Sequence, residues 1–261
     1  MRRAVGAGVL AAALLVPVVP LLAWAVAGEF RYPDLVPTFS GRGLALLGDP
    51  AVRSALGTSL VIALSVAVLA TVVGSAAGRA LGLYAFPGRR AVQLLLLAPV
   101  LVPTFAVTLG IQVFFIRYGL ADTVAGVVLV QLIPTVPYAG LVMAASFAAF
   151  DVDTEDAARV LGAGPLRRLR HVTLPAVAPG LAVAALFAFL ISWSEYILTL
   201  LIGGGTVQTL PLLLFASIGS ADLTAAAALS LVIAAPPVLL VGLTARFLTG
   251  DRATVVGFGR L

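Results

Sequence analysis

The chain has 261 residues, of which 61% are hydrophobic and 10% are charged, with a formal net charge of +5. A soluble domain carries about 25% charged residues, so this composition excludes an ordinary soluble protein and indicates a membrane protein. The absence of cysteine excludes disulfides, a thiolate metal site and a catalytic thiol. All sixteen basic residues are Arg and lie between apolar runs, where they set membrane orientation and do not predict binding to nucleic acid.

The N-terminal segment predicts a first membrane span. Two Arg at positions 2 and 3 precede an apolar run from Ala4 to Ala27. The small residues at the end of this run also resemble a signal peptide cleavage site. The run is longer than the usual signal-peptide core of about 7–15 residues, which favours a retained helix. Residues 28–53 are rich in charge, Pro and Gly, and predict an external segment.

Five further apolar runs are long enough to cross a bilayer, which takes about 20 residues each. They predict spans at about Ser54–Gly78, Ala91–Ile116, Thr123–Phe150, Pro179–Ile202 and Leu223–Phe247. Prolines inside these runs fit either spans that line a pathway or kinked packing helices, because neighbouring helices or water can satisfy the freed carbonyls. Glycines at positions 74, 78 and 82 recur every four residues, which predicts close approach of another helix.

The arginines predict the orientation of these spans. Twelve of the sixteen lie in segments that this layout places on one side, and four on the other. The side rich in Arg is expected to be cytoplasmic, which places both termini and the segment Asp151–Pro175 there. Residues 203–222 are then an external connection. The predicted organisation is residues 1–53 as first helix and external segment, 54–250 as transmembrane domain and 251–261 as cytoplasmic tail.

The segment Asp151–Pro175 is strongly polar and holds four of the eleven acids, four arginines and the single His171. Acids at its start favour a short helix, for which Asp153 is the expected N-cap. Gly162 predicts the end of that helix, and Pro165 the start of a second. Leu174-Pro175 is expected to end the second helix. Two short helices with small residues at the elbow predict a docking site for a partner in water.

The spacing within this segment resembles a known signature. The transmembrane subunits of binding-protein-dependent ABC importers carry E-A-A, three residues, G, nine residues, I, one residue and L-P. The matching residues here are Asp156, Ala157, Ala158, Gly162, Val172, Leu174 and Pro175. Asp156 replaces Glu and Val172 replaces Ile, which keeps the charge and the apolar character. Glu155, one residue earlier, is a second candidate for the acidic role. The similarity covers about Ser54–Phe247.

This resemblance implies an all-α membrane protein, a six-transmembrane-helix bundle with a cytoplasmic coupling-helix hairpin in the bacterial inner membrane. It implies three kinds of partner: a homodimeric ATP-binding subunit, a second permease subunit and an extracytoplasmic substrate-binding protein. The signature residues and Glu155 would couple to the ATPase, and the chain itself would have no catalytic or metal site. Because the sequence has no Lys, it has no G-x-x-x-x-G-K-[ST] motif, so ATP and Mg²⁺ are expected on the partner and no cofactor on this chain.

Glu195 is the one acid within a predicted span. Carboxylates inside a membrane are costly and usually face a bundle interior or a cavity. Glu195 is therefore a candidate pathway residue that could meet a cationic solute, and the alternative is a hydrogen-bonded packing residue near the helix end. Trp193 and Tyr196 are candidates for the same pathway, with packing or interfacial anchoring as their alternative. His171 is expected to be a solvated residue.

The cargo has two candidate classes. The stretches 30–37 and 203–212 look most like permeases of the polyamine, iron(III), thiamine and phosphonate branch. The sugar branch shares the Trp-x-Glu-aromatic pattern at Trp193–Tyr196, so it stays an alternative. An ion-coupled secondary transporter is an alternative of another class. Such proteins often place several ionisable groups at the midplane, whereas this chain has Glu195 alone.

Overall fold

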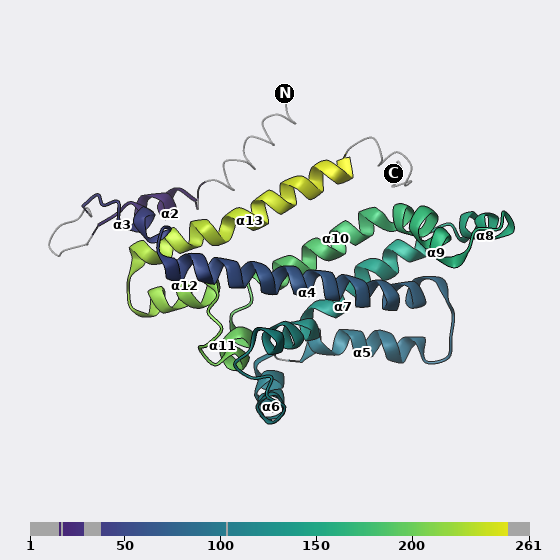
Figure 1. Cartoon of the computed structure of the whole chain (residues 1–261), viewed down its shortest axis with the longest axis horizontal. Coiled ribbons are helices and arrows are strands. Elements are labelled where there is room, and N and C mark those ends of the chain that lie inside the picture. Colours follow the sequence, from purple (N-terminus) through teal and green to yellow (C-terminus); the bar gives the residue numbers. More distant parts are fainter. Residues whose placement is uncertain (1–15, 17, 29–37, 103, 250–261) are drawn as a thin grey trace. The chain divides into compact units, whose positions relative to one another are not determined.

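The computed structural model describes residues 16, 18–28, 38–102 and 104–249. Within that part the regular structure is helical, and an isolated bridge between Ala27 and Phe39 is the one extended pairing. The chain forms two compact units. Unit 1 comprises Met1–Ser59 and Gln208–Val238, and unit 2 comprises Leu60–Val207 and Leu239–Leu261. Figure 1 labels the helices of both.

Four helical runs in the described residues are long and apolar enough to cross a membrane. They are α4 (Pro50–Leu83), α7 (Val124–Ala148), the run Pro165–Trp193, and Leu223–Ala245 within α13 (Leu223–Thr249). They support the prediction of an all-helical membrane protein. Most of the predicted first span and the whole predicted tail 251–261 lie outside the described residues. The described part of the first span contains the helix α2 (Val18–Ala25). The count of six spans stays a prediction.

The predicted third span is not one helix. It consists of α5 (Arg89–Leu101) and α6 (Thr104–Arg117). Val102 between them has extended geometry, with φ −90° and ψ 134°. A proline disfavours helical geometry in the residue before it, and Pro103 follows Val102 in the sequence. The predicted span from Ala91 to Ile116 is therefore divided into two helices, and whether it crosses the membrane stays a prediction.

The predicted fifth span and the connection after it also differ. Helix α10 (Leu174–Trp193) ends before Ser194, and a separate helix, α11, covers Ile197–Gly203. The following segment was expected to be an external connection. It contains α12 (Leu210–Gly219), whose first three residues are buried. Apolar periodicity could not reveal the break, because both α10 and α11 are apolar.

Unit 1 contains α2, α3 (Arg42–Leu46), α12 and the first part of α13. Its small core cluster joins Ala25 of α2 to Ala227 and Ala228 of α13. An ion pair links Arg42 to Asp222, with Nη2 and Oδ2 2.5 Å apart. Small residues therefore let α2 and α13 approach within this unit, and a charge pair joins α3 to the start of α13.

Unit 2 is built around α7, which packs against α4, α5, α6, α10 and α11. The three glycines of α4 at positions 74, 78 and 82 lie against α7. A Cβ atom added at these glycines would come within 2.5–2.7 Å of a Cβ atom of α7. The facing residues are Ala139, Met143 and Phe147, in that order. The prediction that these glycines permit close helix approach is confirmed.

Candidate functional site

The polar segment after α7 forms two short helices. Helix α8 covers Val152–Val160, and α9 covers Pro165–Arg168. Figure 1 shows α8 at one end of unit 2. Asp151 has extended geometry, and its side chain accepts a hydrogen bond from the N–H of Asp153 at 3.1 Å. The N-cap is therefore Asp151, and the prediction that Asp153 has this role is wrong. A cap at Asp153 would require α8 to begin at Thr154, whereas it begins two residues earlier, at Val152.

Gly162 makes the elbow between α8 and α9. Its φ is +81°, a conformation that residues with a side chain rarely adopt. Its N–H donates to the carbonyl of Arg159 at 3.0 Å, and the N–H of Ala163 donates to that of Ala158 at 3.0 Å. This pair of bonds is the Schellman motif, which satisfies the last carbonyls of a helix. Together with Pro165 as the start of α9, it matches the helix boundaries expected from the sequence.

The end of the second helix differs from expectation. The chain stays helical from Pro165 to Trp193, because a π-helical turn, η1 (Leu169–Thr173), joins α9 to α10. Pro175 lies in the first turn of α10. A proline is tolerated in a first turn, and the altered hydrogen-bond pattern of a π-turn lies directly before it. The prediction that Leu174-Pro175 ends the helix is therefore wrong.

The two adjacent acids of α8 have opposite surroundings. Glu155 is 8% exposed, and its two carboxylate oxygens lie 3.0 and 2.9 Å from Nη2 of Arg79 in α4. The hydroxyl of Thr173 also donates to Glu155 at 3.3 Å. The side chain of Asp156 is 51% exposed and pairs with Arg159 on the same helix at 2.9 Å. The acid in the signature position therefore faces outward, and its neighbour faces inward.

The elbow presents three large apolar side chains. Val160 is 87% exposed, Leu161 86% and Leu166 75%. We call Val160, Leu161 and Leu166, none of which belongs to the signature, the apolar tip. Among the signature residues, Ala157, Leu174 and Pro175 are exposed, and Ala158 and Val172 are half-buried. Contiguous exposed apolar residues rimmed by polar ones mark interaction sites.

His171 is exposed, and its Nδ1 lies 3.1 Å from the carbonyl oxygen of Arg167, as expected for a solvated hairpin residue. Arg79 and Thr173 were missed by the sequence analysis. Arg79 was placed in the loop that follows the second span, whereas α4 continues to Leu83. The available signal was that no Pro lies between Pro50 and Pro87, so nothing in the sequence ends the helix before Arg79.

A second polar cluster lies inside unit 2, around the buried Gln131 of α7. The hydroxyl of Ser192 in α10 donates to Oε1 of Gln131, and Nε2 of Gln131 donates to the hydroxyl of Thr199 in α11 at 3.0 Å. All three side chains are buried. Their hydrogen bonds join three helices in an otherwise apolar interior. An amide inside an apolar run was the sequence signal for this cluster.

The three candidate pathway residues lie at the break between α10 and α11. Oε1 of Glu195 accepts a hydrogen bond from the N–H of Leu198 at 3.0 Å, which caps the start of α11. Trp193 is buried and stacks on Phe189, with ring centroids 5.5 Å apart. Tyr196 takes the N-cap position of α11. These contacts fit capping and packing, and contact with a solute stays a prediction for all three.

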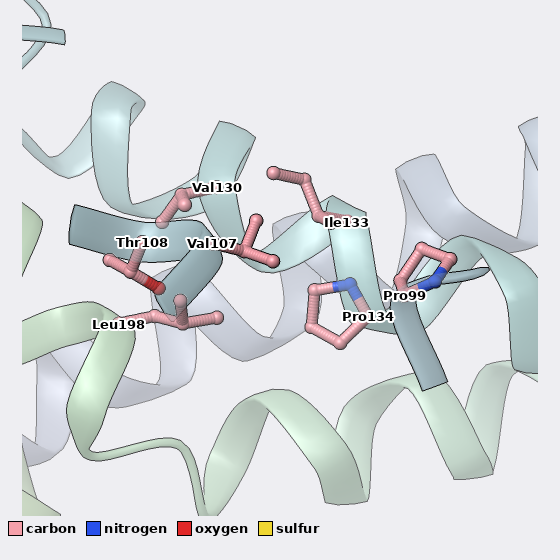
Figure 2. Close-up of a pocket in the computed structure, with 7 residues that line it drawn as sticks. All are labelled: Pro99, Val107, Thr108, Val130, Ile133, Pro134 and Leu198. Atoms are coloured by element: carbon pink, nitrogen blue, oxygen red, sulfur yellow. The ribbon is translucent and has the colours of Figure 1, made fainter. Parts of the chain in front are cut away.

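One pocket of unit 2 brings together prolines from two predicted spans (Figure 2). It is lined by Pro99, Val107, Thr108, Val130, Ile133, Pro134 and Leu198. The lining is almost wholly apolar, with one hydroxyl, that of Thr108. None of the candidate residues at the α10–α11 break is among these lining residues. The pocket therefore has little polar chemistry for holding a polar solute.

Comparison with known proteins gives concordant matches. A family model described as "Binding-protein-dependent transport system inner membrane component" matches residues 70–249. The trehalose transport system permease protein SugB of Mycobacterium tuberculosis is 36% identical over 56% of this chain and 54% of its own length. The putrescine transport system permease protein PotI of Escherichia coli is 29% identical over 66% of this chain and 64% of its own length. The chain thus spans between half and two thirds of the length of these two relatives.

Among solved structures, the fold is similar to the crystal structure of a bacterial ABC transporter involved in the import of the acidic polysaccharide alginate. The TM-score is 0.68 with 18% identity, and the match covers 95% of both chains. The family implies an ATP-binding subunit and a substrate-binding protein as partners, and a multi-pass location in the inner membrane. With more than half of its residues matched by one family model, the chain belongs to the inner membrane components of binding-protein-dependent transport systems, the permease subunits of ABC importers.

Proposed function

We propose that this chain forms half of the translocation pathway of an importer and that the hairpin of α8 and α9 docks into an ATP-binding subunit. The observation that carries the proposal is the apolar tip, held outward by the Schellman turn at Gly162. Removing apolar surface from water is worth about 25 cal/mol per Å². A partner groove that covers the tip gains this energy, and the polar residues of α8 around it can supply orientation.

The partners and the orientation follow from the same proposal. The ATP-binding subunit carries ATP and Mg²⁺ as a homodimer, and a second permease, similar or identical, supplies the other half of the pathway. The hairpin and both termini lie in the cytoplasm, on the side where the arginines concentrate. ATP-driven closure of the dimer then moves the hairpins and switches the pathway between its inward-facing and outward-facing states.

The docking test changes the apolar tip without touching the interior. Leu161→Gln is expected to lower the amount of ATP-binding subunit that co-purifies with the permease, because it replaces an exposed apolar contact by an amide. Val152→Gln is the matched control, since Val152 is also exposed but lies at the opposite end of α8. Equal co-purification of the ATPase with both variants and with the unchanged chain would overturn the docking assignment.

Two further variants test the elbow and the outward acid. Gly162→Val places a β-branched residue at a φ of +81°, and Asp156→Arg reverses the charge of the exposed signature acid. Both are expected to detach or uncouple the ATPase while the permease still inserts in the membrane. Gly164→Ala is the control for the glycine, because Gly164 has φ −63° and open space around it. Normal ATP-driven uptake by both variants would contradict the proposal.

The cargo is a small polar solute, for which the relatives support two classes. Sequence features favour a polyamine, iron(III), thiamine or a phosphonate, and PotI is named for putrescine. The sugar branch is equally supported, since SugB is named for trehalose. Uptake of labelled putrescine and trehalose into ATP-loaded vesicles containing the complete complex separates these classes. Uptake that continues without ATP and stops when an ion gradient is dissipated would instead show a secondary transporter.

A further inference from the structure

We propose that Glu155 is a positioning residue that fastens the docking hairpin to α4, while the adjacent Asp156 faces the ATP-binding subunit. This inference rests on the proposed docking function and divides it between two neighbouring acids. One acid lies in the interior of unit 2 and the other on its surface. Their roles therefore differ although they are consecutive in the sequence.

Several elements of unit 2 converge on the Glu155 carboxylate. Arg79 reaches it from α4, with both carboxylate oxygens at 2.9–3.0 Å, and Thr173 reaches it from the π-turn η1. The guanidinium carbon of Arg79 also lies 5.8 Å from the ring centre of Phe147 in α7. We call Glu155, Arg79 and Thr173 the hairpin lock. A buried charge is tolerated only where partners and hydrogen bonds satisfy it, and the lock supplies both.

The lock changes which helices receive the motion of the hairpin. Helix α10 follows α9 and η1 along the chain, so it moves with the hairpin through the backbone. Helix α4 lies about 70 residues earlier in the sequence, and the Arg79–Glu155 contact gives it a side-chain link to α8. A displacement of α8 therefore reaches α4 as well as α10. Without the lock, α8 can move without carrying α4 with it.

The distance between α8 and α4 tests the lock directly. The sequence has no cysteine, so spin labels on Val152→Cys in α8 and Tyr84→Cys after α4 are the two labels on the permease. In the full-length chain in lipid nanodiscs, the distance distribution is expected to be narrow. Glu155→Gln is expected to broaden this distance distribution, because a neutral amide lacks the negative charge that pairs with the Arg79 guanidinium. Reversing the pair, Glu155→Arg with Arg79→Glu, is expected to narrow it again.

A coupling readout separates positioning from general damage. In the complete complex, ATP hydrolysis is measured with and without the purified substrate-binding protein. Glu155→Gln is expected to retain the co-purified ATP-binding subunit and to lose the stimulation by the binding protein. General damage would lower the two rates in proportion and leave their ratio unchanged. Asp153→Asn is the matched control, because it removes one exposed acid from the same helix and is expected to keep the stimulation.

The outcomes for the lock and for docking can be told apart. A narrow distribution and full stimulation in Glu155→Gln would overturn the lock while docking stands. The same loss in Asp153→Asn as in Glu155→Gln would also overturn it, because any acid on α8 would then suffice. If the unchanged chain recruits no ATP-binding subunit, the docking proposal fails, whereas the distance measurement needs no partner and still decides whether the lock exists.

Discussion

Glu195 combines a functional candidate with a visible structural role. Its carboxylate accepts the N–H of Leu198 at the start of α11, where a backbone donor has no partner within the helix. An acid at this place is also favoured by the positive end of the helix. The hydrogen bond to Leu198 therefore explains why a carboxylate lies within an apolar segment, and no cationic solute is needed for that explanation.

Substitutions at Glu195 distinguish these roles. Glu195→Gln keeps an acceptor for the cap, so thermal stability in nanodiscs is expected to stay near that of the unchanged chain. Glu195→Ala removes this hydrogen bond and is expected to lower the free energy of unfolding by about 0.5–1.5 kcal/mol, the net value of a typical hydrogen bond. If Glu195→Gln abolishes uptake of putrescine while the melting temperature is unchanged, the carboxylate contacts a cationic solute and capping is not its main role.

The buried Gln131 permits a prediction of the same kind. Gln131→Ala leaves the hydroxyls of Ser192 and Thr199 without their shared partner. An unsatisfied buried polar group costs about 1–3 kcal/mol, so a marked fall in melting temperature is expected. Thr135→Val is the control, because the Thr135 hydroxyl bonds only to the carbonyl of Gln131 in its own helix among the contacts described. An equal fall in both variants would contradict a role for the amide as a link between helices.

At the residue level, the sequence predicted the types of residue at the site better than their roles. The glycine stop and the proline start were predicted because they depend on local backbone preferences. The difference between Glu155 and Asp156 was not predictable, because it depends on Arg79, which lies 76 residues away. The cap was assigned to Asp153 in place of Asp151, since both are acids and the choice depends on where α8 begins.

Among the helices of unit 2, α4 and α7 approach one another closely. Three glycines create this close approach, and each leaves no room for a side chain. Gly78→Leu is expected to separate the two helices and to destabilise the protein by about 1–3 kcal/mol, the usual range for overpacking. Thermal unfolding in nanodiscs measures the change. Gly57→Ala on the same helix is the control, because the Cβ it would add meets no atom within 4 Å apart from its chain neighbours and the backbone of its own helix.

The prolines show why the ends of the helices were hard to predict from the sequence. Pro134 and Pro137 lie inside α7, and Pro99 lies inside α5, so these residues do not interrupt their helices. The break between α5 and α6 is seen at Val102, which precedes Pro103 in the sequence, and Pro175 does not end a helix. The local rule is the same for all five prolines. Pro175 is tolerated because it lies in a first turn, whereas neighbouring helices can satisfy the carbonyls that Pro99, Pro134 and Pro137 leave free, and the sequence does not show that packing.

For the molecule as a whole, the arginine distribution predicts the side of the membrane on which each loop lies. A cysteine introduced at Val160, on the apolar tip, is expected to react with a membrane-impermeant maleimide only from the cytoplasmic side. A cysteine at the exposed Tyr118, after α6, is expected to react only from the outside. The natural chain has no cysteine, so the unchanged protein is the blank. Labelling of both positions from the same side would contradict the predicted topology.

The unbroken helical run from Pro165 to Trp193 has a mechanical consequence. Its 29 residues, at about 1.5 Å per residue, give a rod of roughly 40 Å, longer than the hydrocarbon core of about 30 Å. The run is helical throughout, although the π-turn η1 and Pro179 are places where a helix can bend. A displacement passed along this run would reach Ser194, where α10 ends, and α11 begins three residues later at Ile197. The first end of the helical run beyond the elbow is therefore about a full membrane thickness away from the elbow.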